Sequence, residues 1–263
     1  DEPMGCKAIV QARMGSTRLP GKILLPLASK PALFHVIERL RCCRTLEAVV
    51  VATTQSATDD RVERFCEILE VPCFRGSEED VLDRYYQAAR KFDADPVVRI
   101  TADCPVIDPG IVDEVVSCYY RGEYDVYGLS GDFPDGLDCT VFRFSALEEA
   151  WRKAELPSER EHVGPYLTKN KDCFRVDGYR PFQGLRHHRW TLDEPADYKF
   201  LSILFDRLYR PDRIFSTADI LDLLKKEPDL MKINSGIIRN EGYLKSLERD
   251  KQGSGTNSNS TSS

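Results

Sequence analysis

The feature that most constrains the fold is a run of apolar, mostly β-branched residues, AVVVAT at residues 48–53. Polar residues do not alternate along it, which is typical of a strand buried on both faces of a parallel sheet. The other strands of the first half are expected at residues 7–13, 71–74 and 96–100, and the helices between them at 31–44, 59–69, 79–92 and 109–120. This alternation with short links predicts an α/β fold, in which a mostly parallel sheet is flanked by helices on both faces.

The pattern changes after residue 121. Strands are predicted at 124–128, 137–144, 174–179 and 189–192, helices at 145–154 and 161–169, and mainly helical structure from 195 to about 247. The end of the chain, QGSGTNSNSTSS, has no apolar side chain to bury, so residues 251–263 are expected to form a disordered tail. Residues 5–250 are expected to form a single domain, because α/β units of this size are common.

Composition excludes several classes of protein. The 263 residues include 43 acidic and 37 basic side chains, a formal net charge of −6, which does not indicate a nucleic-acid-binding surface. The nine cysteines include no CxxC pair, which favours reduced thiols and a cytoplasmic location. No apolar run is long enough to span a membrane. We therefore expect a soluble cytoplasmic protein, with neither nucleic acid nor a membrane as partner.

The most informative segment for function is the basic loop that follows the first predicted strand, QARMGSTRLPGK at residues 11–22. It carries Arg13, Arg18 and Lys22, together with two glycines, a serine and a threonine. In an open parallel sheet, ligands bind at the loops that follow the carboxyl ends of the strands. Three cations and accessible backbone N–H groups at that position are suited to a polyphosphate. The alternative interpretation is a solvated basic surface loop.

Two common phosphate-binding loops do not match this segment. A Walker loop has four residues between its first glycine and Gly-Lys, whereas Gly15 and Gly21 enclose five residues and Ile23 follows Lys22. The GxGxxG dinucleotide fingerprint is absent from the sequence, and so is the GxSxG motif of serine hydrolases. Covalent catalysis is therefore not expected.

The chain resembles a known family from this loop onward. QARMGSTRLPGKILLPLASKPALFHVIERL is similar to the opening of the cytidylyltransferases that make CMP-sugars, and most of all to their spore-coat-polysaccharide protein F type. That branch is related to the CMP-acylneuraminate and CMP-3-deoxy-octulosonate synthetases. The family's loop, close to Arg-x-x-Ser-x-Arg-x-Pro-x-Lys, is matched at Arg13, Ser16, Arg18, Pro20 and Lys22.

The resemblance becomes weaker along the chain and extends to about residue 210. It implies a Rossmann-like nucleotide-diphospho-sugar transferase fold. It also implies a nucleotide-binding half at residues 5–120 and an acceptor-binding and dimerisation half at residues 121–250. In related enzymes a projecting hairpin forms the dimer, and residues 121–145 are the candidate for it here, so a homodimer is a possible assembly.

The first of two important acidic positions is Asp103. It lies just past the strand predicted at residues 96–100, on the same sheet edge as the basic loop. The resemblance makes Asp103 a ligand of Mg²⁺, an ion that proteins typically bind through one or two carboxylates plus phosphate oxygens and water. Asp108 precedes Pro109 and is instead expected to cap the following helix.

The second acidic position is Asp193, which the resemblance makes the other ligand of the metal. It also suits the N-cap of a helix that begins near Pro195, although Glu194 is nearer to that proline. The adjacent His187 and His188 do not indicate a transition-metal site, because neighbouring histidines rarely chelate one ion.

The remaining candidates rest on weaker signals. The nucleotide-binding residues are expected to be Ala12, Arg13, Gly15, Ser16, Arg18, Lys22, Arg75, Ser77 and Asp80. Ser77 is equally suited to begin a helix. The acceptor-binding residues are expected to be Asp138, Arg160, His162 and Arg189, whose cations could hold a carboxylate. Arg160 and His162 would also be ordinary on a solvated helix face.

Together these features predict a Mg²⁺-dependent cytidylyltransferase that needs no organic cofactor. An acceptor hydroxyl would attack the α-phosphate of CTP, and pyrophosphate would leave. The catalytic residues would be Arg13, Lys22, Asp103 and Asp193. The product would be a CMP-activated acidic sugar for surface polysaccharide synthesis.

Several alternatives stay open. The choice of CTP over other nucleotides rests on the resemblance, and the acceptor could be a nonulosonic or octulosonic acid, a phosphonate or a polyol phosphate. Two other function classes are a nucleotide-sugar-dependent glycosyltransferase and a non-catalytic nucleotide-binding protein of the same fold. The glycosyltransferases usually carry a DxD-type metal motif after a strand, and this chain shows none there.

Overall fold

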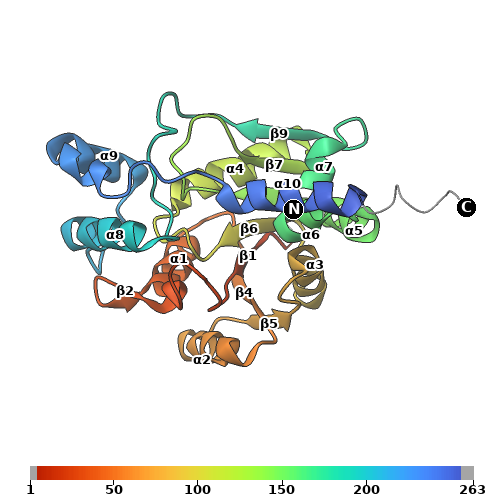
Figure 1. The fold of residues 1–263 in the computed structure, drawn as a ribbon, viewed down its shortest axis with the longest axis horizontal. Coiled ribbons are helices and arrows are strands. Elements are labelled where there is room, and N and C mark those ends of the chain that lie inside the picture. Colours follow the sequence, from red (N-terminus) through yellow and green to blue (C-terminus); the bar gives the residue numbers. More distant parts are fainter. Residues whose placement is uncertain (1–4, 256–263) are drawn as a thin grey trace, which may run out of the picture.

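The computed structural model describes residues 5–255. Its central feature is a seven-stranded sheet with the strand order β5-β4-β1-β6-β8-β7-β9 (Figure 1). The strands are β1 (Lys7–Gln11), β4 (Ala48–Thr54), β5 (Cys73–Gly76), β6 (Val97–Thr101), β7 (Val126–Leu129), β8 (Thr140–Phe142) and β9 (Val176–Tyr179). A small ribbon of β2 (Pro26–Leu27) and β3 (Lys30–Pro31) lies outside this sheet. The predicted α/β fold, with a mostly parallel sheet flanked by helices, is confirmed.

The first half of the chain forms the parallel part of the sheet. β1 pairs in parallel with β4 on one side and with β6 on the other, and β5 extends the sheet beyond β4. In β4, six of the seven residues are buried, which explains why this strand reads as an apolar run without polar alternation. Because these four strands run in one direction, the loops that follow them gather at one edge.

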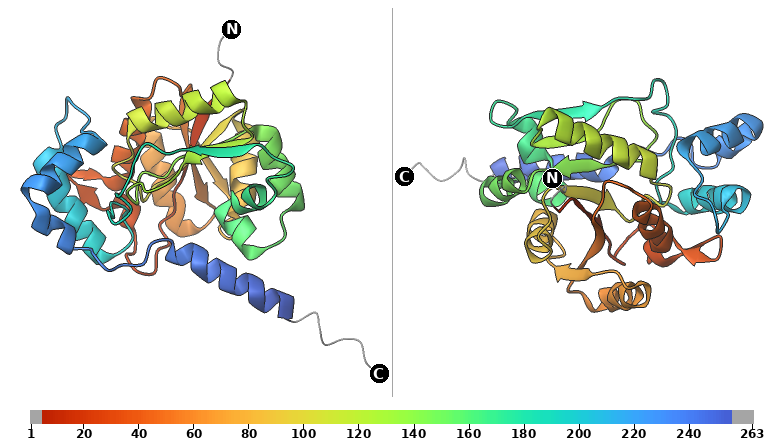
Figure 2. Two further views of the ribbon diagram at one scale, coloured as in Figure 1. Left: turned by 90° about the horizontal axis from the view of Figure 1, so that it is seen from above. Right: turned by 180° about the vertical axis from the view of Figure 1, so that it is seen from behind.

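Helices cover both faces of the sheet. One face packs against α1 (Ala32–Arg41), α2 (Asp60–Leu69), α4 (Pro109–Gly122), α8 (Pro195–Leu208) and α9 (Thr217–Lys226). The other face packs against α3 (Val81–Lys91), α5 (Phe144–Lys153) and α7 (Pro165–Lys169). Successive side chains of β1 enter opposite cores, with Ala8 and Val10 in the first and Ile9 in the second. Figure 2 shows α8 and α9 on one flank of the sheet and α5 on the other.

The second half of the chain makes the sheet mixed. β8 lies between β6 and β7 and is antiparallel to both, and β9 pairs in parallel with β7 at the edge. The prediction of a projecting hairpin at residues 121–145 is wrong, because β7 and β8 are interior strands of the main sheet. Their backbone groups bond to neighbouring strands of the same chain.

Three further predictions need correction. Residues 189–192 form a single bridge to Asp135 and no strand. The predicted helix at 161–169 is two short helices, α6 (Pro157–His162) and α7, because the backbone reverses at Val163 with φ of +69°. The helical run from Pro195 is divided into α8, α9, the 3₁₀ turn η3 (Pro228–Lys232) and α10 (Glu241–Gly255).

The last helix, α10, crosses in front of the edge where the parallel strands end (Figure 1). Residues 251–255 belong to this helix, so the prediction of a disordered tail is wrong for them, and residues 256–263 lie outside the described residues. Within the part of the chain that the structure describes, no helix is long and apolar enough to cross a membrane.

Candidate active site

The basic loop leaves the end of β1 and encloses a cavity of about 250 Å³, here called the loop cavity. Its tight return is set by Gly21, whose N–H donates to the Met14 carbonyl at 3.1 Å and whose φ of +68° suits glycine. The predicted residues that line this cavity are Arg13, Gly15, Ser16, Arg18, Lys22 and Asp103. The structure therefore brings the basic loop and the first predicted metal ligand together.

The loop is anchored by Asp59, a residue that the sequence marked only as a helix start. Its carboxylate accepts a hydrogen bond from the Met14 N–H at 2.7 Å and another from the Thr54 hydroxyl. Asp59 is 1% exposed, and a buried carboxylate with two donors forms a rigid attachment. Asp59 thereby fixes the middle of the loop to the end of β4.

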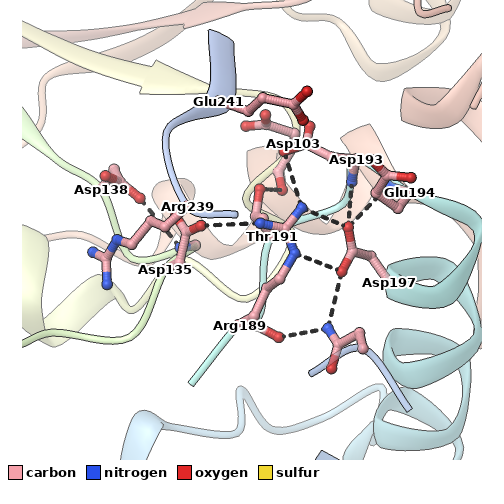
Figure 3. A network of polar contacts seen from close by, with 12 residues as sticks. Asp103, Asp135, Asp138, Arg189, Thr191, Asp193, Glu194, Asp197, Arg239 and Glu241 are labelled. Atoms are coloured by element: carbon pink, nitrogen blue, oxygen red, sulfur yellow. Dashed lines mark hydrogen bonds and ion pairs between the residues drawn. The ribbon is translucent and has the colours of Figure 1, made fainter. Parts of the chain in front are cut away.

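Asp103 lies two residues past the end of β6 and is held by its own neighbours. The Thr101 hydroxyl donates to the Asp103 carboxylate at 2.5 Å. The Asp103 carbonyl accepts from the Leu192 N–H at 2.8 Å and from the Thr191 hydroxyl at 3.2 Å. These contacts dock the segment that precedes α8 onto the end of β6, and so place Asp193 beside Asp103 (Figure 3).

The two carboxylates share one ammonium group. Lys22 Nζ lies 2.6 Å from Asp193 Oδ1 and 3.8 Å from Asp103 Oδ2. The Asp193 side chain is therefore not the N-cap of α8. That position belongs to Glu194, whose N–H donates to Asp197 at 2.8 Å. Asp103 and Asp193, which follow Lys22 by 81 and 171 positions in the sequence, thus converge on its ammonium group.

Charge and burial perturb all three groups. Burial raises the pKa of Asp103, and the charge of Asp193 raises it further. Burial alone would raise the pKa of Asp193, but the charge and hydrogen bond of Lys22 outweigh burial, so this pKa is lowered. Burial alone would lower the pKa of Lys22, but the two carboxylates raise it. A cation between these carboxylates is therefore favoured electrostatically at neutral pH.

The donor set fits Mg²⁺. An ammonium already lies between two carboxylates, and Lys22 and Asp103 line the loop cavity. Among residues 5–255 no cluster of three or more His, Cys, Asp or Glu side chains is arranged to hold a metal. A site with two carboxylates suits an ion that keeps water and takes phosphate oxygens, and does not suit a closed zinc site.

A second cavity, of about 280 Å³, adjoins the first and is here called the carboxylate cavity. It shares Arg18, Thr101 and Asp103 with the loop cavity. Its other walls carry Asp135, Asp138, Arg189, Asp193 and Glu241. Together with Asp103, the acidic side chains of this cavity come from four separate segments of the chain (Figure 3).

The turn that carries Asp135 and Asp138 is docked by close backbone contact. Asp135 exchanges backbone hydrogen bonds with the segment opposite, from its N–H to the His188 carbonyl at 3.0 Å and from the Trp190 N–H to its carbonyl at 2.7 Å. Gly136 has a φ of +110°, and a Cβ there would lie 2.7 Å from the Trp190 carbonyl carbon. This position therefore requires glycine.

The pKa of Asp135, another carboxyl of this cavity, is also strongly perturbed. Asp135 is 9% exposed, and burial together with the neighbouring Asp138 raises its pKa to about 7. The guanidinium groups of Arg239 and Arg189 lower the pKa but do not cancel the shift. A carboxyl group with a pKa near neutrality in a cavity is suited to proton transfer.

Arg189 is fully engaged by protein groups. Its Nε and one terminal nitrogen each donate to the Asp197 carboxylate at 2.9 Å, and Asp197 is 0% exposed. Its other terminal nitrogen lies 3.5 Å from Asp135. Arg189 therefore organises the acidic walls, and its charge is largely used within the protein.

Several predicted binding residues are likewise held by protein contacts. Arg160 grips the Asp80 carboxylate with hydrogen bonds of 2.7–3.1 Å, and Asp80 also caps α3 by accepting from the Asp83 N–H. Ser77 Oγ accepts from the Asp80 N–H at 3.0 Å. Arg75 donates to two backbone carbonyls and to Asp60, and it lines none of the cavities described here.

The third cavity, of about 710 Å³, lies beside α6 and is here called the α6 cavity. Arg13 and Gln11 connect it with the loop cavity, and His162 with the carboxylate cavity. His162 is hydrogen-bonded to Ser246 of α10 at 2.9 Å, and burial lowers its pKa. Ala12 is buried, with its N–H bonded to the Ala52 carbonyl at 3.1 Å.

Comparison with known proteins shows the family. A model of the cytidylyltransferases matches residues 7–225. This chain belongs to the cytidylyltransferase family. It is 32% identical to spore coat polysaccharide biosynthesis protein SpsF of Bacillus subtilis, over 84% of this chain and 94% of that protein. It is 34% identical to the 3-deoxy-manno-octulosonate cytidylyltransferase of Nitratidesulfovibrio vulgaris, over 74% of this chain and 82% of that protein.

A solved cytidylyltransferase structure from Leptospira borgpetersenii is also similar. Its TM-score is 0.83 at 35% identity, over 90% of this chain and 100% of that one. The predicted family and the predicted Rossmann-like transferase fold are thus confirmed. The family model ends at residue 225, whereas Glu241 of α10 lines the carboxylate cavity. This cytidylyltransferase therefore builds part of that cavity from a segment beyond the matched region.

Proposed function

We propose that this cytidylyltransferase transfers CMP from CTP to an acidic sugar and releases pyrophosphate, with Mg²⁺ as its cofactor. The observation that carries the proposal is the Lys22 ammonium between Asp103 and Asp193, at the rim of a cavity lined by Arg13 and Arg18. Cations for a polyphosphate and carboxylates for a metal meet there. The nine free thiols and the relatives' roles support a cytoplasmic enzyme of surface polysaccharide synthesis.

The cationic loop would bind the leaving group. Arg13, Arg18 and Lys22 would hold the β- and γ-phosphates and neutralise the charge that develops on pyrophosphate. Backbone N–H groups near Gly15 and Ser16 would contribute further donors. Because phosphoryl transfer depends on positioning and electrostatics, this loop supplies much of what the reaction requires.

Asp103 and Asp193 would hold Mg²⁺ when the nucleotide is bound. When present, the ion would neutralise phosphate oxygens and lower the barrier to displacement at the α-phosphate. Lys22 would then leave the carboxylates and turn toward the phosphates. Asp135, whose pKa is raised to about 7 by burial and Asp138, would accept the proton of the acceptor hydroxyl.

The acceptor would occupy the carboxylate cavity. This cavity adjoins the loop cavity and shares Asp103 with it, so an acceptor hydroxyl there would lie beside a triphosphate bound along the basic loop. An acidic sugar is favoured by the similarity to a 3-deoxy-manno-octulosonate cytidylyltransferase. The nucleoside would extend toward the α6 cavity, beside Arg13.

A pyrophosphate-release assay tests this function. Each of CTP, UTP, ATP and GTP is combined with a panel of 2-ulosonic acids and neutral sugars, with Mg²⁺ or with a chelator. The proposal predicts release with CTP, Mg²⁺ and an acid, and loss of at least about 100-fold in Asp103→Asn. The matched control Asp229→Asn changes an exposed carboxylate that lines none of the cavities described here, and it is expected to keep full activity. Release without Mg²⁺, or from another nucleotide alone, would contradict the proposal.

A further inference from the structure

The cavities are lined by several guanidinium groups, and almost all of them already have a carboxylate partner. Arg13 pairs with Glu78, Arg18 with Glu194 and Glu241, and Arg189 with Asp197. On the walls of the α6 cavity, Arg160 pairs with Asp80 and Arg249 with Glu161. Within residues 5–255, Arg99 is the arginine on these walls that has no carboxylate partner.

Arg99 is held in place without being neutralised. One terminal nitrogen donates to the Gln11 side-chain oxygen at 3.0 Å, and the guanidinium lies 5.5 Å from the centre of the Tyr85 ring. Tyr85 is itself fixed, because its hydroxyl contacts the carbonyls of Ile9 and Ile100. The side chain therefore has little freedom to move away from the cavity wall.

Most of the hydrogen-bonding capacity of Arg99 is unused. A guanidinium has five N–H donors, and the bond to Gln11 uses one of them. Its Nε is buried and has no partner in the described part of the chain. The terminal nitrogens carry the other N–H groups, and Arg99 lines the carboxylate cavity. Arg99 is therefore suited to bind an anion with two acceptor oxygens.

The position of Arg99 identifies that anion. Arg99 and His162 form the wall that the carboxylate cavity shares with the α6 cavity. Arg99 is on β6, and its neighbour on the same face of this strand, Thr101, bonds to Asp103. Arg99 and Asp103, the carboxylate that would hold the metal, therefore line the same cavity, in which the acceptor would meet the α-phosphate.

The chemistry of the acceptor matches this position. In a 2-ulosonic acid, the anomeric hydroxyl and the carboxylate are attached to the same carbon. A hydroxyl that attacks the α-phosphate therefore brings its carboxylate within a few ångströms of the reaction centre. Asp135, Asp138 and Asp193 on the same cavity would repel that carboxylate unless a cation held it.

We propose that Arg99 binds the carboxylate of the acceptor and makes the enzyme specific for acidic sugars. This inference rests on the proposed transfer of CMP to an acid, and it names the residue that recognises the acid. Arg160 and Arg189, the arginines that the sequence favoured for this task, are held by Asp80 and Asp197. Arg99, which has no carboxylate partner within residues 5–255, is available to bind the acceptor carboxylate.

The experiment uses the full chain and the 2-ulosonic acid that gives the fastest pyrophosphate release with CTP. Kinetic constants are measured for that acid and for its carboxamide, in the wild type, Arg99→Gln and Arg99→Lys. Arg207→Gln is the matched control, because its exposed guanidinium pairs with Glu227 and lines none of the cavities described here. Thermal unfolding of each variant shows that it is folded.

The proposal predicts that Arg99→Gln raises the KM for the acid by about 10- to 100-fold and leaves the KM for CTP within about two-fold. The wild type should prefer the acid over the carboxamide by a similar factor, and Arg99→Gln should lose this preference. Arg99→Lys should retain part of it, since it keeps the charge but not the two-donor geometry.

Other outcomes would overturn the inference. Arg99 would be a nucleotide contact if Arg99→Gln raised the KM for CTP instead. Its role would be merely structural if the variant lost activity equally toward the acid and the carboxamide. If neutral sugars were accepted and no acid was, the proposed acceptor class would fail together with the inference. An absence of CTP-dependent release with every acceptor would overturn the proposed function itself.

Discussion

Replacing Lys22 with methionine tests the electrostatics of the site without any substrate. Met keeps most of the length and apolar volume of the side chain and removes the ammonium. The ammonium lies between Asp103 and Asp193, at 3.8 Å and 2.6 Å. In Lys22→Met these two carboxylates would face each other without the ammonium, and the Arg189 guanidinium, 3.5 Å from Asp193, would offset only part of their repulsion. The folded protein should therefore be destabilised at neutral pH.

The expected size of the effect follows from burial. Removing one partner of a fully buried ion pair costs about 3–5 kcal/mol, whereas an exposed pair is worth at most about 1 kcal/mol. The three side chains are between 17% and 27% exposed, so the site lies between these limits. We expect Lys22→Met to lose about 2 kcal/mol, which corresponds to roughly 4–8 °C in Tm for a domain of this size.

Magnesium makes the prediction specific. If the ion binds between Asp103 and Asp193, it replaces the missing ammonium in Lys22→Met, but in the wild type it must displace Lys22. Urea unfolding at pH 7, with and without Mg²⁺, should therefore show greater stabilisation of the variant than of the wild type. The deficit should also shrink at lower pH, as the unpaired carboxylates become protonated.

The matched control is Lys232→Met, which removes an exposed ammonium paired with Asp229. It should change stability by less than about 0.5 kcal/mol and should not alter the response to Mg²⁺. Equal stability of Lys22→Met and the wild type, or an equal Mg²⁺ response in both, would refute the reasoning.

Three further predictions follow from the carboxylate cavity. Burial raises the pKa of Asp135 to about 7 in the folded protein, so the free energy of unfolding depends on pH. The stabilising contribution of Asp135 is complete below about pH 4, and up to about 4 kcal/mol of it is lost as the pH rises to about 7. Asp135→Asn should remove this loss in urea titrations across pH 4–8, and an unchanged pH dependence would contradict it. Glu241→Gln should lower the KM for CTP by about 1.5- to 5-fold, since Arg18 loses a competing exposed partner at 2.6 Å, and a raised KM would show that Glu241 assists binding. Gly136→Ala should destabilise the protein by about 1–3 kcal/mol and slow turnover, because its Cβ would contact the Trp190 backbone at 2.7 Å; a variant of wild-type stability would contradict this.

The sequence was sufficient to place the parallel half of the fold. The apolar run of β4 and the helical periodicities around it are local signals, and the strands and helices they predict are present. The convergence of the basic loop with Asp103 also follows from a general rule, because both come after parallel strands of one sheet. Only the bounds of these elements differ, by a few residues.

The second half depends on contacts that local patterns do not contain. Residues 189–192 look like a strand, but the N–H groups of Trp190 and Leu192 bond to Asp135 and Asp103. The insertion of β8 between β6 and β7 is likewise a pairing choice between distant segments. Such long-range pairing cannot be read from periodicity, which reports only how each segment distributes its own side chains.

The candidate site shows the same limit at the level of side chains. Arg160 was predicted to bind the acceptor and Arg99 was not, and nothing local in the sequence tells which of the two is neutralised. The structure distinguishes the two, because the Asp80 carboxylate pairs with Arg160, whereas Arg99 keeps N–H donors without a partner in the described part of the chain. Asp135 could be noticed from its turn sequence, but its raised pKa comes from burial against the distant residues 188–190.

The central claim is that the basic loop and the two carboxylates form one site for a metal-bound nucleoside triphosphate. The most direct test is a crystal structure with CTP and Mn²⁺ in place of Mg²⁺, in which anomalous scattering locates the metal. The account predicts Mn²⁺ coordinated by Asp103 and Asp193, with the β- and γ-phosphates along Arg13, Arg18 and Lys22. A nucleotide bound elsewhere, or a metal that contacts neither carboxylate, would contradict it.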